Sequence, residues 1–231
     1  MNEVLREEKK FLISQDKMYY VSHRLEEVMH LDAHGDSEGY SIRSLYFDSL
    51  HNRDFTEKED GIELRRKIRL RNYSPYSDFA MLEMKQKQGQ YQKKRSLKLK
   101  KEDALKLIAG NYSVLLDQDS DFANECFYMM NQYQYRPKAV ITYKRKAFVA
   151  KENSIRVTFD HHLKGTESYF NIFDPEINEN YIMDPYLAVM EVKFNGFLLS
   201  YVKDVIDKVD LPETSVSKYY MGRLMTQYAL S

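Results

Sequence analysis

The sequence predicts an eight-stranded antiparallel β-barrel with helices packed outside, a fold of the α+β class. The first observation is a run of basic residues at every second position between Glu63 and Arg95. Alternate residues of a strand lie on one face, so one face of this region is mostly cationic, whereas Ile68 and Leu70 lie on an apolar face. The cationic parity of the segment ELRRKIRLR holds Arg65, Lys67, Arg69 and Arg71.

The same alternation recurs in four other segments, which is the second observation. They are MLEMK with Glu83 and Lys85, ITYKRKAF with Tyr143 and Arg145, IRVTFD with Arg156, Thr158 and Asp160, and VMEVKF with Glu191 and Lys193. Several strands with one charged and one apolar face favour a closed sheet whose interior holds the charge. Eight strands suit a small barrel that has room for side chains and one threaded ligand.

Eight segments have the length and composition of strands. They are Arg6–Ser14, Tyr40–Asp48, Ile62–Tyr73, Phe79–Lys87, Tyr91–Leu99, Ala139–Ala150, Ile155–His161 and Tyr186–Asn195. A tight hairpin at Gln88-Gly-Gln90 and another turn near Glu152-Asn153 join neighbouring strands, so most of the order is a meander.

Helices are expected in the segments between and after these strands. Ser14 can cap a helix that runs to about Met29. The other predicted helices are Lys101–Ile108, Asp121–Tyr133, Leu198–Val209 and Ser217–Ala229. His51–Asp60 is polar and predicts a loop or a short helix, and Lys164–Pro185 is irregular.

Composition narrows the class of protein. The chain has 231 residues and is 43% hydrophobic, which fits a single domain over 1–231. A net charge of zero argues against a generally basic nucleic-acid binder. Lys58–Lys101 nevertheless holds 14 Lys and Arg against 5 Asp and Glu. Cys126 is the only cysteine and is expected in the core, while no apolar signal region or membrane span is visible, so we expect a cytoplasmic protein.

Clustered cations in a barrel interior cost several kcal/mol each, on the order of a buried unpaired charge, unless something pairs them. Phosphate is the natural partner for Arg and Lys, so a polyanion is the expected ligand. A solvated edge strand or outer face is the alternative interpretation, and it is common for one strand. It accounts less well for charged alternation on five strands.

Acidic residues accompany the cations in recurring Glu-x-Lys pairs: Glu8/Lys10, Glu83/Lys85 and Glu191/Lys193. These carboxylates could orient neighbouring cations or hold a divalent metal that bridges phosphate oxygens. No glycine-rich nucleotide loop is present, so a phosphate site must be built from side chains. The histidines lack metal-ligand spacing. Ser217 and Lys218 fit a helix cap, although a helix start can also bind phosphate.

In chain order, these motifs resemble the VTC domain, the polyphosphate polymerase domain of the vacuolar transporter chaperone family and its bacterial relatives, within the triphosphate tunnel metalloenzymes. The resemblance runs from Arg6 to about Arg223. It rests on eight strings: Arg6-x-Glu8-x-Lys10-Phe11, Ser44-Leu45-Tyr46-Phe47-Asp48, Lys67-x-Arg69-x-Arg71, Leu82-Glu83-x-Lys85, Tyr143-x-Arg145-x-Ala147-Phe148, Arg156-x-Thr158-x-Asp160, Glu191-Val192-Lys193 and Ser217-Lys218-Tyr219.

The resemblance implies a tunnel barrel that binds ATP, triphosphate or polyphosphate with Mn²⁺ or Mg²⁺. The implied catalytic phosphate ligands are Lys10, Arg69, Arg71, Lys85, Arg145, Lys193 and Lys218. Further substrate contacts are expected from Lys67, Lys94, Tyr143, Arg156 and Ser217. Glu191 is the implied metal carboxylate, with help from Glu8 or Glu83. Because the chain has no membrane segment of its own, any coupling to a membrane would need a membrane-protein partner.

One position departs from the related CYTH triphosphatases, which begin with Glu-x-Glu-x-Lys. Arg6 stands at the first of those Glu positions, which favours a VTC-type polymerase that passes the γ-phosphate of ATP to a growing polyphosphate chain. Two alternatives to the polymerase stay open at this point. One is a metal-dependent hydrolase of triphosphate or nucleoside triphosphate, and the other is a polyphosphate-binding module without turnover.

Overall fold

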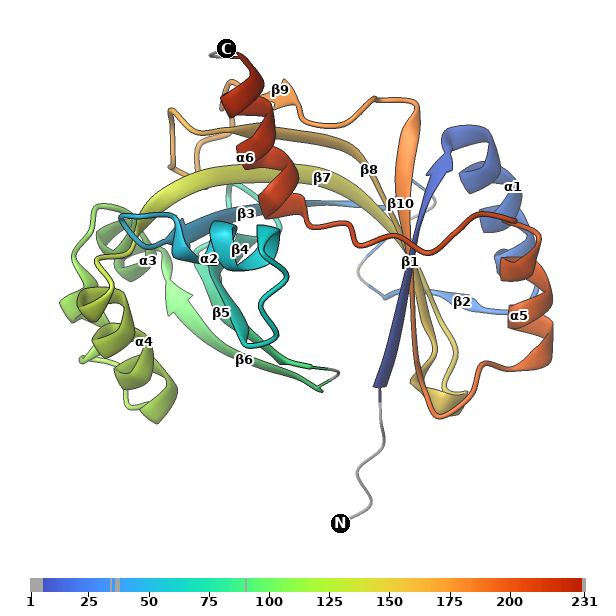
Figure 1. Cartoon of the computed structure of the whole chain (residues 1–231), viewed down its shortest axis with the longest axis horizontal. Coiled ribbons are helices and arrows are strands. Elements are labelled where there is room, and N and C mark those ends of the chain that lie inside the picture. The colour runs from blue at the N-terminus through green and yellow to red at the C-terminus, as the bar shows by residue number, and fades with distance from the viewer. Residues whose placement is uncertain (1–5, 34, 36–37, 90, 230–231) are drawn as a thin grey trace. The chain divides into compact units, whose positions relative to one another are not determined.

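A computed structural model of the chain describes residues 6–33, 35, 38–89 and 91–229 (Figure 1). Its contacts divide the chain into two compact units. Unit 1 comprises residues 1–41, 143–163 and 181–217, and unit 2 comprises residues 42–142, 164–180 and 218–231. Each unit is built from three separate stretches of sequence, so the two units do not correspond to an N-terminal and a C-terminal half of the chain. The single domain over 1–231 stays a prediction.

The strands, which differ in length, form one large sheet, and the chain has an α+β fold, as predicted. Hydrogen bonds join the eight long strands in the order β1-β10-β8-β7-β3-β4-β5-β6. The ladders with a defined register are all antiparallel. The strands are β1 (Arg6–Ser14), β2 (His30–Leu31), β3 (Tyr40–Asp48), β4 (Arg65–Asn72), β5 (Phe79–Gln88), β6 (Tyr91–Lys100), β7 (Arg136–Val149), β8 (Arg156–Thr166), β9 (Asn180–Tyr181) and β10 (Leu187–Asn195).

The closed barrel is not confirmed, because the strand order is open and begins at β1 and ends at β6. Within the described residues, the short β2 and β9 are the only strands off this path; they pair with β7 and β8. Both end strands are rich in lysine, with Lys9 and Lys10 on β1 and Lys93, Lys94 and Lys98 on β6. Charged side chains, lysine above all, are a common protection of an open sheet edge against pairing with other strands.

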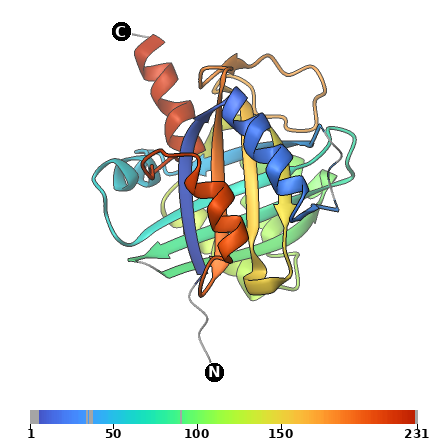
Figure 2. The same ribbon diagram turned by 90° about the vertical axis from the view of Figure 1, so that its right-hand side faces the viewer.

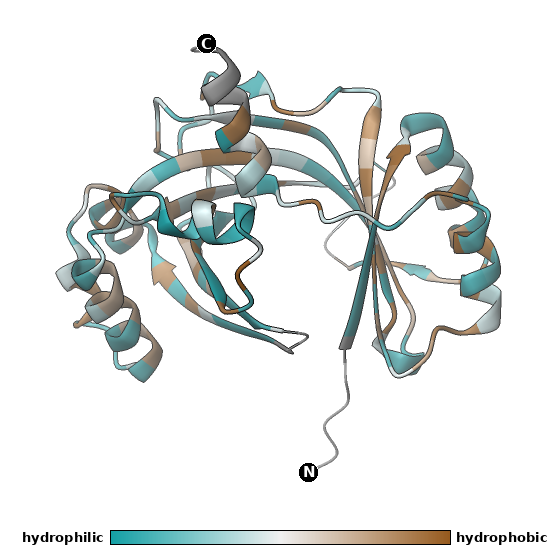
Figure 3. Ribbon diagram, in the orientation of Figure 1, coloured by the Kyte–Doolittle hydropathy of each residue, from teal (hydrophilic) through white to brown (hydrophobic). Residues whose placement is uncertain are grey.

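Unit 1 packs two helices on the apolar face of its strands. Helices α1 (Gln15–Glu26) and α5 (Ser200–Asp207) lie over β1, β10 and β8 (Figure 2). The Ser14 hydroxyl accepts a hydrogen bond from the Lys17 amide, which confirms the predicted cap. The core beneath joins Phe11, Ile13, Met18, Val21, Leu25, Phe148, Val157, Phe159, Met190, Val192, Val202 and Ile206. Both helices carry hydrophobic and hydrophilic residues, as one-sided burial requires (Figure 3).

Unit 2 has its own core, built from the apolar parity of β3 to β6. Leu45, Ile68, Leu70, Leu82, Met84 and Leu99 pack there with Leu107, Leu115, Cys126 and Met130. The last four come from α3 (Lys101–Ile108), the 3-10 helix η1 (Tyr112–Leu115) and α4 (Asp121–Gln132). Figure 1 shows α4 alongside β6. Cys126 is fully buried, so the core thiol predicted from the sequence is confirmed.

Several element boundaries differ from the sequence predictions for local reasons. Residues 62–64 precede β4 rather than belonging to it, and Leu64 is exposed. The polar segment after β3 forms a short helix, α2 (Arg53–Glu59), and the last helix, α6, runs over Lys218–Ala229. Strand β8 continues to Thr166 by passing through His162, whose φ of 51° marks an irregularity in the strand.

Candidate functional site

In unit 1, the strand face opposite α1 and α5 is charged, and in unit 2, the strand face opposite α3 and α4 is charged. This confirms the parity read from the sequence, although the two charged faces are described separately below. The predicted site residues fall into two groups. Unit 1 holds Glu8, Lys10, Tyr143, Arg145, Arg156, Glu191, Lys193 and Ser217, and unit 2 holds Lys67, Arg69, Arg71, Glu83, Lys85, Lys94 and Lys218.

The unit 2 face is organised around Glu83, whose side chain is only 4% exposed. Its Oε2 atom accepts from the Arg69 guanidinium at 2.8 Å and lies 3.3 Å from Arg71 Nη2. Its Oε1 atom lies 2.6 Å from Lys94 Nζ. Burial alone would raise the pKa of Glu83, but the charges of Arg69 and Lys94 outweigh it and hold the pKa below its ordinary value. One carboxylate therefore serves three cations.

Two more lysines extend this face. Lys67 on β4 and Lys85 on β5 are directly opposite each other in the ladder, and Lys85 is opposite Lys94 on β6. Like charges at opposite ladder positions destabilise a sheet. Of the site residues predicted from sequence, unit 2 therefore brings five cations together on the neighbouring strands β4, β5 and β6, with the carboxylate of Glu83 among them. The five are Lys67, Arg69, Arg71, Lys85 and Lys94.

A chain of aromatic contacts connects this cluster to the start of α6. Arg69 donates a hydrogen bond of 3.0 Å to the Tyr46 hydroxyl. The Tyr46 ring stacks on Tyr219, with ring centroids 5.3 Å apart. Tyr219 in turn donates to the buried carboxylate of Asp48 at 2.6 Å. Tyr219 follows Lys218, the first residue of α6, so these contacts fix where the helix begins.

Asp48 is a structural anchor that sequence reasoning did not single out. Its carboxylate accepts from the backbone amides of Ser49, Asp54 and Phe55 at 2.6, 2.9 and 3.0 Å. It thus satisfies amides at the start of α2 as well as the Tyr219 hydroxyl. The signal was present in the string that ends in Phe47-Asp48, because an acid after a strand and before a polar segment is typical of a helix start.

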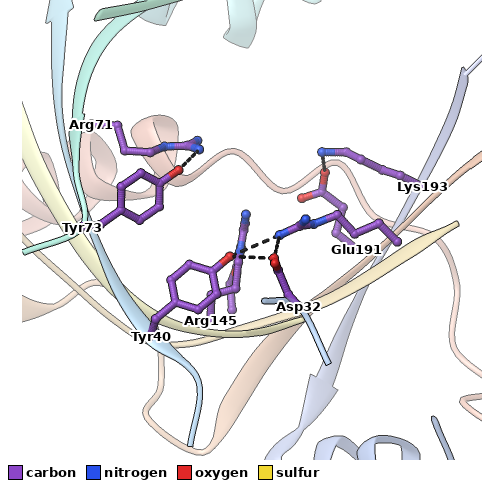
Figure 4. Close-up of polar contacts among 9 residues, drawn as sticks. Asp32, Tyr40, Arg71, Tyr73, Arg145, Glu191 and Lys193 are labelled. Carbon is purple, nitrogen blue, oxygen red and sulfur yellow. Dashed lines mark hydrogen bonds and ion pairs between the residues drawn. The ribbon is translucent and has the colours of Figure 1, made fainter. Parts of the chain in front are cut away.

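The unit 1 face pairs two lysines with two glutamates. Glu8 Oε1 lies 2.6 Å from Lys10 Nζ, and Glu8 Oε2 lies 3.7 Å from Lys193 Nζ. Lys193 also forms an ion pair with Glu191, as Figure 4 shows. The ladder between β1 and β10 sets these contacts, since Glu8 is opposite Lys193 and Lys10 is opposite Glu191. The Glu-x-Lys pairs predicted from sequence therefore interlock across two strands.

Arg145 is held by a fully buried acid, Asp160. The guanidinium donates twice, from Nε to Oδ1 at 2.6 Å and from Nη2 to Oδ2 at 2.7 Å. Burial lowers the pKa of Arg145, but the Asp160 charge outweighs it, so the pKa lies well above its ordinary value. The ring of Tyr143 lies beneath the guanidinium, 5.5 Å from Cζ to the centroid. These contacts fix the orientation of the Arg145 guanidinium.

The backbone before β3 lies very close to the backbone of Arg145, and a glycine makes this approach possible. Gly39 has φ of +82°, in the left-handed region, and precedes β3. A Cβ atom there would lie 2.3 Å from the carbonyl oxygen of Arg145, which no side chain tolerates.

Arg156 also has a partner within the chain. It forms an ion pair with Asp32 and donates to the Tyr40 hydroxyl at 3.1 Å. Figure 4 shows the Tyr40 hydroxyl directed at Asp32, at 3.4 Å. Asp32 lies between β2 and β3 with no pattern to mark it. Asp32, Asp160 and three glutamates therefore pair several of these cations within the chain, as the sequence analysis allowed for the Glu-x-Lys pairs.

The unit 1 face also offers oxygen ligands suited to a divalent cation. Glu8 and Glu191 supply carboxylates, and the Thr158 hydroxyl, opposite Glu191 in the ladder, is buried without a hydrogen-bond partner in the described residues. Mg²⁺ and Mn²⁺ favour such oxygen donors and often use one or two carboxylates plus substrate phosphates. Among the residues that the structure covers, no group of three or more His, Cys, Asp or Glu could hold a metal by itself. Glu83 fits a cation poorly, because three positive side chains surround it.

Two predicted residues lie at the start of α6. Ser217 directly precedes α6, and Lys218 begins it; both are half-buried. The side chain of Arg6, the position that departs from the CYTH pattern, lies outside the described residues. No helix in the described part of the chain is long and apolar enough to cross a membrane.

Comparison with known proteins identifies the family. The family model of the VTC domain matches residues 5–226. The chain belongs to this family. A VTC domain implies triphosphate or polyphosphate as the general class of substrate, with phosphoryl transfer or triphosphate hydrolysis as the general chemistry. No curated protein sequence matches the chain.

One solved structure supports the fold of this VTC domain. A Bacillus halodurans crystal structure, described as a candidate adenylate cyclase, has a TM-score of 0.54 at 11% identity, covering 92% of this chain and 95% of that one. At this identity the likeness shows the fold alone. Structures from Pyrococcus horikoshii and Pyrococcus furiosus give TM-scores of 0.45 and 0.43 at 9% and 10% identity. They cover 96% and 92% of this chain, and 99% and 95% of their own, and we draw nothing from them.

Proposed function

We propose that this VTC domain is a polyphosphate polymerase, which transfers the γ-phosphate of ATP to a growing polyphosphate chain with Mn²⁺ or Mg²⁺. The observation that supports this proposal is the unit 2 face, where five Arg and Lys side chains lie on the neighbouring strands β4, β5 and β6: Lys67, Arg69, Arg71, Lys85 and Lys94. Several Arg and Lys donors held close together on rigid strands are what a row of linked phosphates requires. The tunnel form of the barrel, which the family resemblance implies, is part of this proposal.

Phosphoryl transfer asks the protein mainly to position phosphates and to stabilise their charge. In the proposal, Arg69 and Arg71 bind phosphate oxygens through their guanidinium forks, with lysines as additional point charges. Lys218 would add a cation at the start of α6, and Ser217 a hydroxyl. The contacts of Tyr46 and Tyr219 hold both Arg69 and α6 in place.

The unit 1 face would supply the metal ligands and further phosphate contacts. Glu191 and Glu8 are the carboxylates that would hold the divalent cation, with the Thr158 hydroxyl beside them. Such an ion, when bound, neutralises charge on phosphate oxygens. Arg145, fixed by Asp160, and the lysines at positions 10 and 193 would contact phosphate oxygens.

Product analysis tests the proposal. Purified protein is incubated with ATP and Mn²⁺, and polyphosphate is separated by gel while released orthophosphate is measured. Long polyphosphate is the expected product. Orthophosphate without polyphosphate would favour the hydrolase alternative. Triphosphate binding without either product would identify a binding module.

Glu191→Gln separates metal-dependent turnover from phosphate binding, since it keeps the shape and removes the charge. We expect Mn²⁺-dependent turnover to fall at least about tenfold, or ~1.4 kcal/mol, while triphosphate still binds without metal. Glu27→Gln, an exposed carboxylate on the surface of unit 1 that contacts Arg24, is the matched control. Unchanged turnover in Glu191→Gln would remove this residue from the metal site.

A further inference from the structure

Arg66 breaks the apolar alternation of β4. It has the same strand parity as Ile68 and Leu70, which are fully buried in the core of unit 2, yet it carries a guanidinium. Arg66 is half-buried against the C-terminal end of α4, where its Nη1 atom lies 2.6 Å from Met129 Sδ and its Cζ atom lies 5.5 Å from the centre of the Tyr133 ring. A thioether is a weak acceptor, so these contacts leave most of the five N–H donors of Arg66 without a strong acceptor.

The acids near Arg66 do not neutralise it. Among the residues that the structure describes, no carboxylate lies within ion-pair distance of Arg66. Glu125 is taken by Arg95, whose Nη2 atom lies 2.6 Å from Glu125 Oε1. Burial, with the charge of Asp48, raises the pKa of Asp54 well above its ordinary value, so Asp54 favours its neutral form. A half-buried guanidinium in such surroundings is costly unless an anion pairs it.

The same tyrosine ring contacts a second arginine, which has a partner. Arg53 Cζ lies 4.6 Å from the centre of the Tyr133 ring, and Arg53 Nε lies 2.6 Å from Glu57 Oε1. Because Tyr133 directly follows α4, both guanidinium groups are near the negative end of the helix dipole. That end carries about half an elementary charge, so it compensates the charge of Arg66 only in part.

Two further donors lie in a row with Arg66. Gln86 on β5 is directly opposite Arg66, and Lys93 on β6 is directly opposite Gln86, so the three side chains share one face of these strands. Gln86 Oε1 accepts from Arg95 at 2.9 Å, which turns the amide nitrogen of Gln86 away from Arg95. Within the described part of the chain, neither that nitrogen nor Lys93 Nζ has an acceptor. The row therefore presents a guanidinium, an amide and an exposed ammonium.

We propose that Arg66, Gln86 and Lys93 form a second anion site, which binds a phosphate group on the strand face of unit 2 opposite the proposed substrate site. Guanidinium, ammonium and amide N–H groups all donate to phosphate oxygens. Neighbouring strands lie about 4.8 Å apart, so adjacent members of the row can contact the same phosphate. None of the three residues belongs to the charged face described above, so the inference goes beyond the proposed function and does not depend on it.

A single fluorophore can report on this site alone. The chain contains no tryptophan, so Tyr133→Trp places one indole beside Arg66. Its fluorescence is titrated with tripolyphosphate in the presence of a chelator, and sodium chloride at equal ionic strength is the reference. We expect a saturable change that sodium chloride does not produce. In this background, Arg66→Met should weaken binding at least about tenfold and Lys93→Gln about threefold, because each removes a charged donor.

Two further variants separate a specific site from general charge. Lys106→Gln is the matched control, since it removes one positive charge from an exposed lysine of α3 in the same unit, and its affinity should stay within about twofold. Arg66→Lys keeps the charge near the end of α4 but loses the planar fork. It should weaken binding severalfold while the free energy of unfolding stays close to the parent's.

The inference is overturned by the absence of a saturable signal, or by a signal that Arg66→Met leaves unchanged. It is also overturned if Arg71→Ala abolishes the signal, because the fluorophore would then report the proposed substrate site. If Tyr133→Trp does not fold, calorimetry counts the tripolyphosphate sites of the parent and of Arg66→Met. Loss of one site supports the inference whether or not the proposed function holds, and an equal number of sites in both proteins refutes it.

Discussion

The buried ion pair between Arg145 and Asp160 allows a quantitative test of how unit 1 is held together. The side chain of Asp160 is 0% exposed and that of Arg145 is 13% exposed, and two hydrogen bonds join them. Breaking a buried pair by removing one partner typically costs about 3–5 kcal/mol, because the other charge stays buried. For a chain of this size, ~1 kcal/mol shifts the melting temperature by about 2–4 °C. Asp160→Asn should therefore lower it by roughly 6–20 °C.

A double-mutant cycle isolates the pair itself. Arg145→Met should cost about as much as Asp160→Asn, since it leaves a buried carboxylate. The double variant buries no unpaired charge, so it should cost far less than the sum, with a coupling free energy of about 2–3 kcal/mol. Urea unfolding followed by circular dichroism measures each corner of the cycle. Additivity within about 0.5 kcal/mol would refute the claim that Asp160 holds Arg145.

A second ion pair in the same unit gives the control for this cycle. Lys146 and Glu26 lie 2.8 Å apart, but the Glu26 side chain is 40% exposed. Exposed pairs contribute about 0.2–1 kcal/mol, since water already solvates both charges. The cycle on Lys146 and Glu26 should therefore show a much smaller coupling free energy than the buried pair.

Three further outcomes follow from other buried groups. Burial and a neighbouring histidine lower the pKa of His161 to about 4, whereas the same side chain has a pKa of about 6.5 in the unfolded chain. The unfolded chain therefore binds more protons below pH 6.5, so the free energy of unfolding should fall as the pH is lowered from about 6.5 to about 4. Urea unfolding at each pH should show a smaller fall for His161→Gln. Tyr219→Phe removes a hydrogen bond to a buried carboxylate and should cost about 1.5–3 kcal/mol in urea unfolding, whereas Tyr169→Phe, whose partner is exposed, should cost less. Leu82→Ala opens a cavity in the fully buried core of unit 2 and should cost about 2–5 kcal/mol, whereas Leu64→Ala, at a residue that is 58% exposed, should change stability little; equal thermal shifts would contradict the burial of Leu82 in this core.

Strand positions and their parity could be predicted from the sequence because both depend on local alternation. Tyr40–Asp48 and Arg6–Ser14 match their strands residue for residue. Buried Ile68 and Leu70 oppose the charged Arg69 and Arg71 as the period of two requires. Closure of the sheet, in contrast, depends on how its two end strands meet, and nothing in the alternation of either strand encodes that.

The counter-ions of the site were harder to predict than its cations. The cations could be recognised in the sequence because they repeat at every second position, as in Lys67-x-Arg69-x-Arg71. Asp32 and Asp160 are single acids whose partners, Arg156 and Arg145, lie far away in sequence or on the next strand. Only the folded backbone brings them together, through the hydrogen bond from the Asp32 amide to the Ala147 carbonyl on β7 and through the pairing of β7 with β8.

The two charged faces differ in how carboxylates are distributed among their cations, and this difference predicts how each face responds to added negative charge. In unit 1, each predicted cation has a carboxylate: Glu8 and Glu191 for the two lysines, and Asp160 and Asp32 for the two arginines. In unit 2, three cations share the carboxylate of Glu83. Cations that each have a carboxylate are held in fixed directions and gain little from added negative charge. Cations that share one carboxylate gain more, so we expect unit 2 to contribute more phosphate affinity than unit 1.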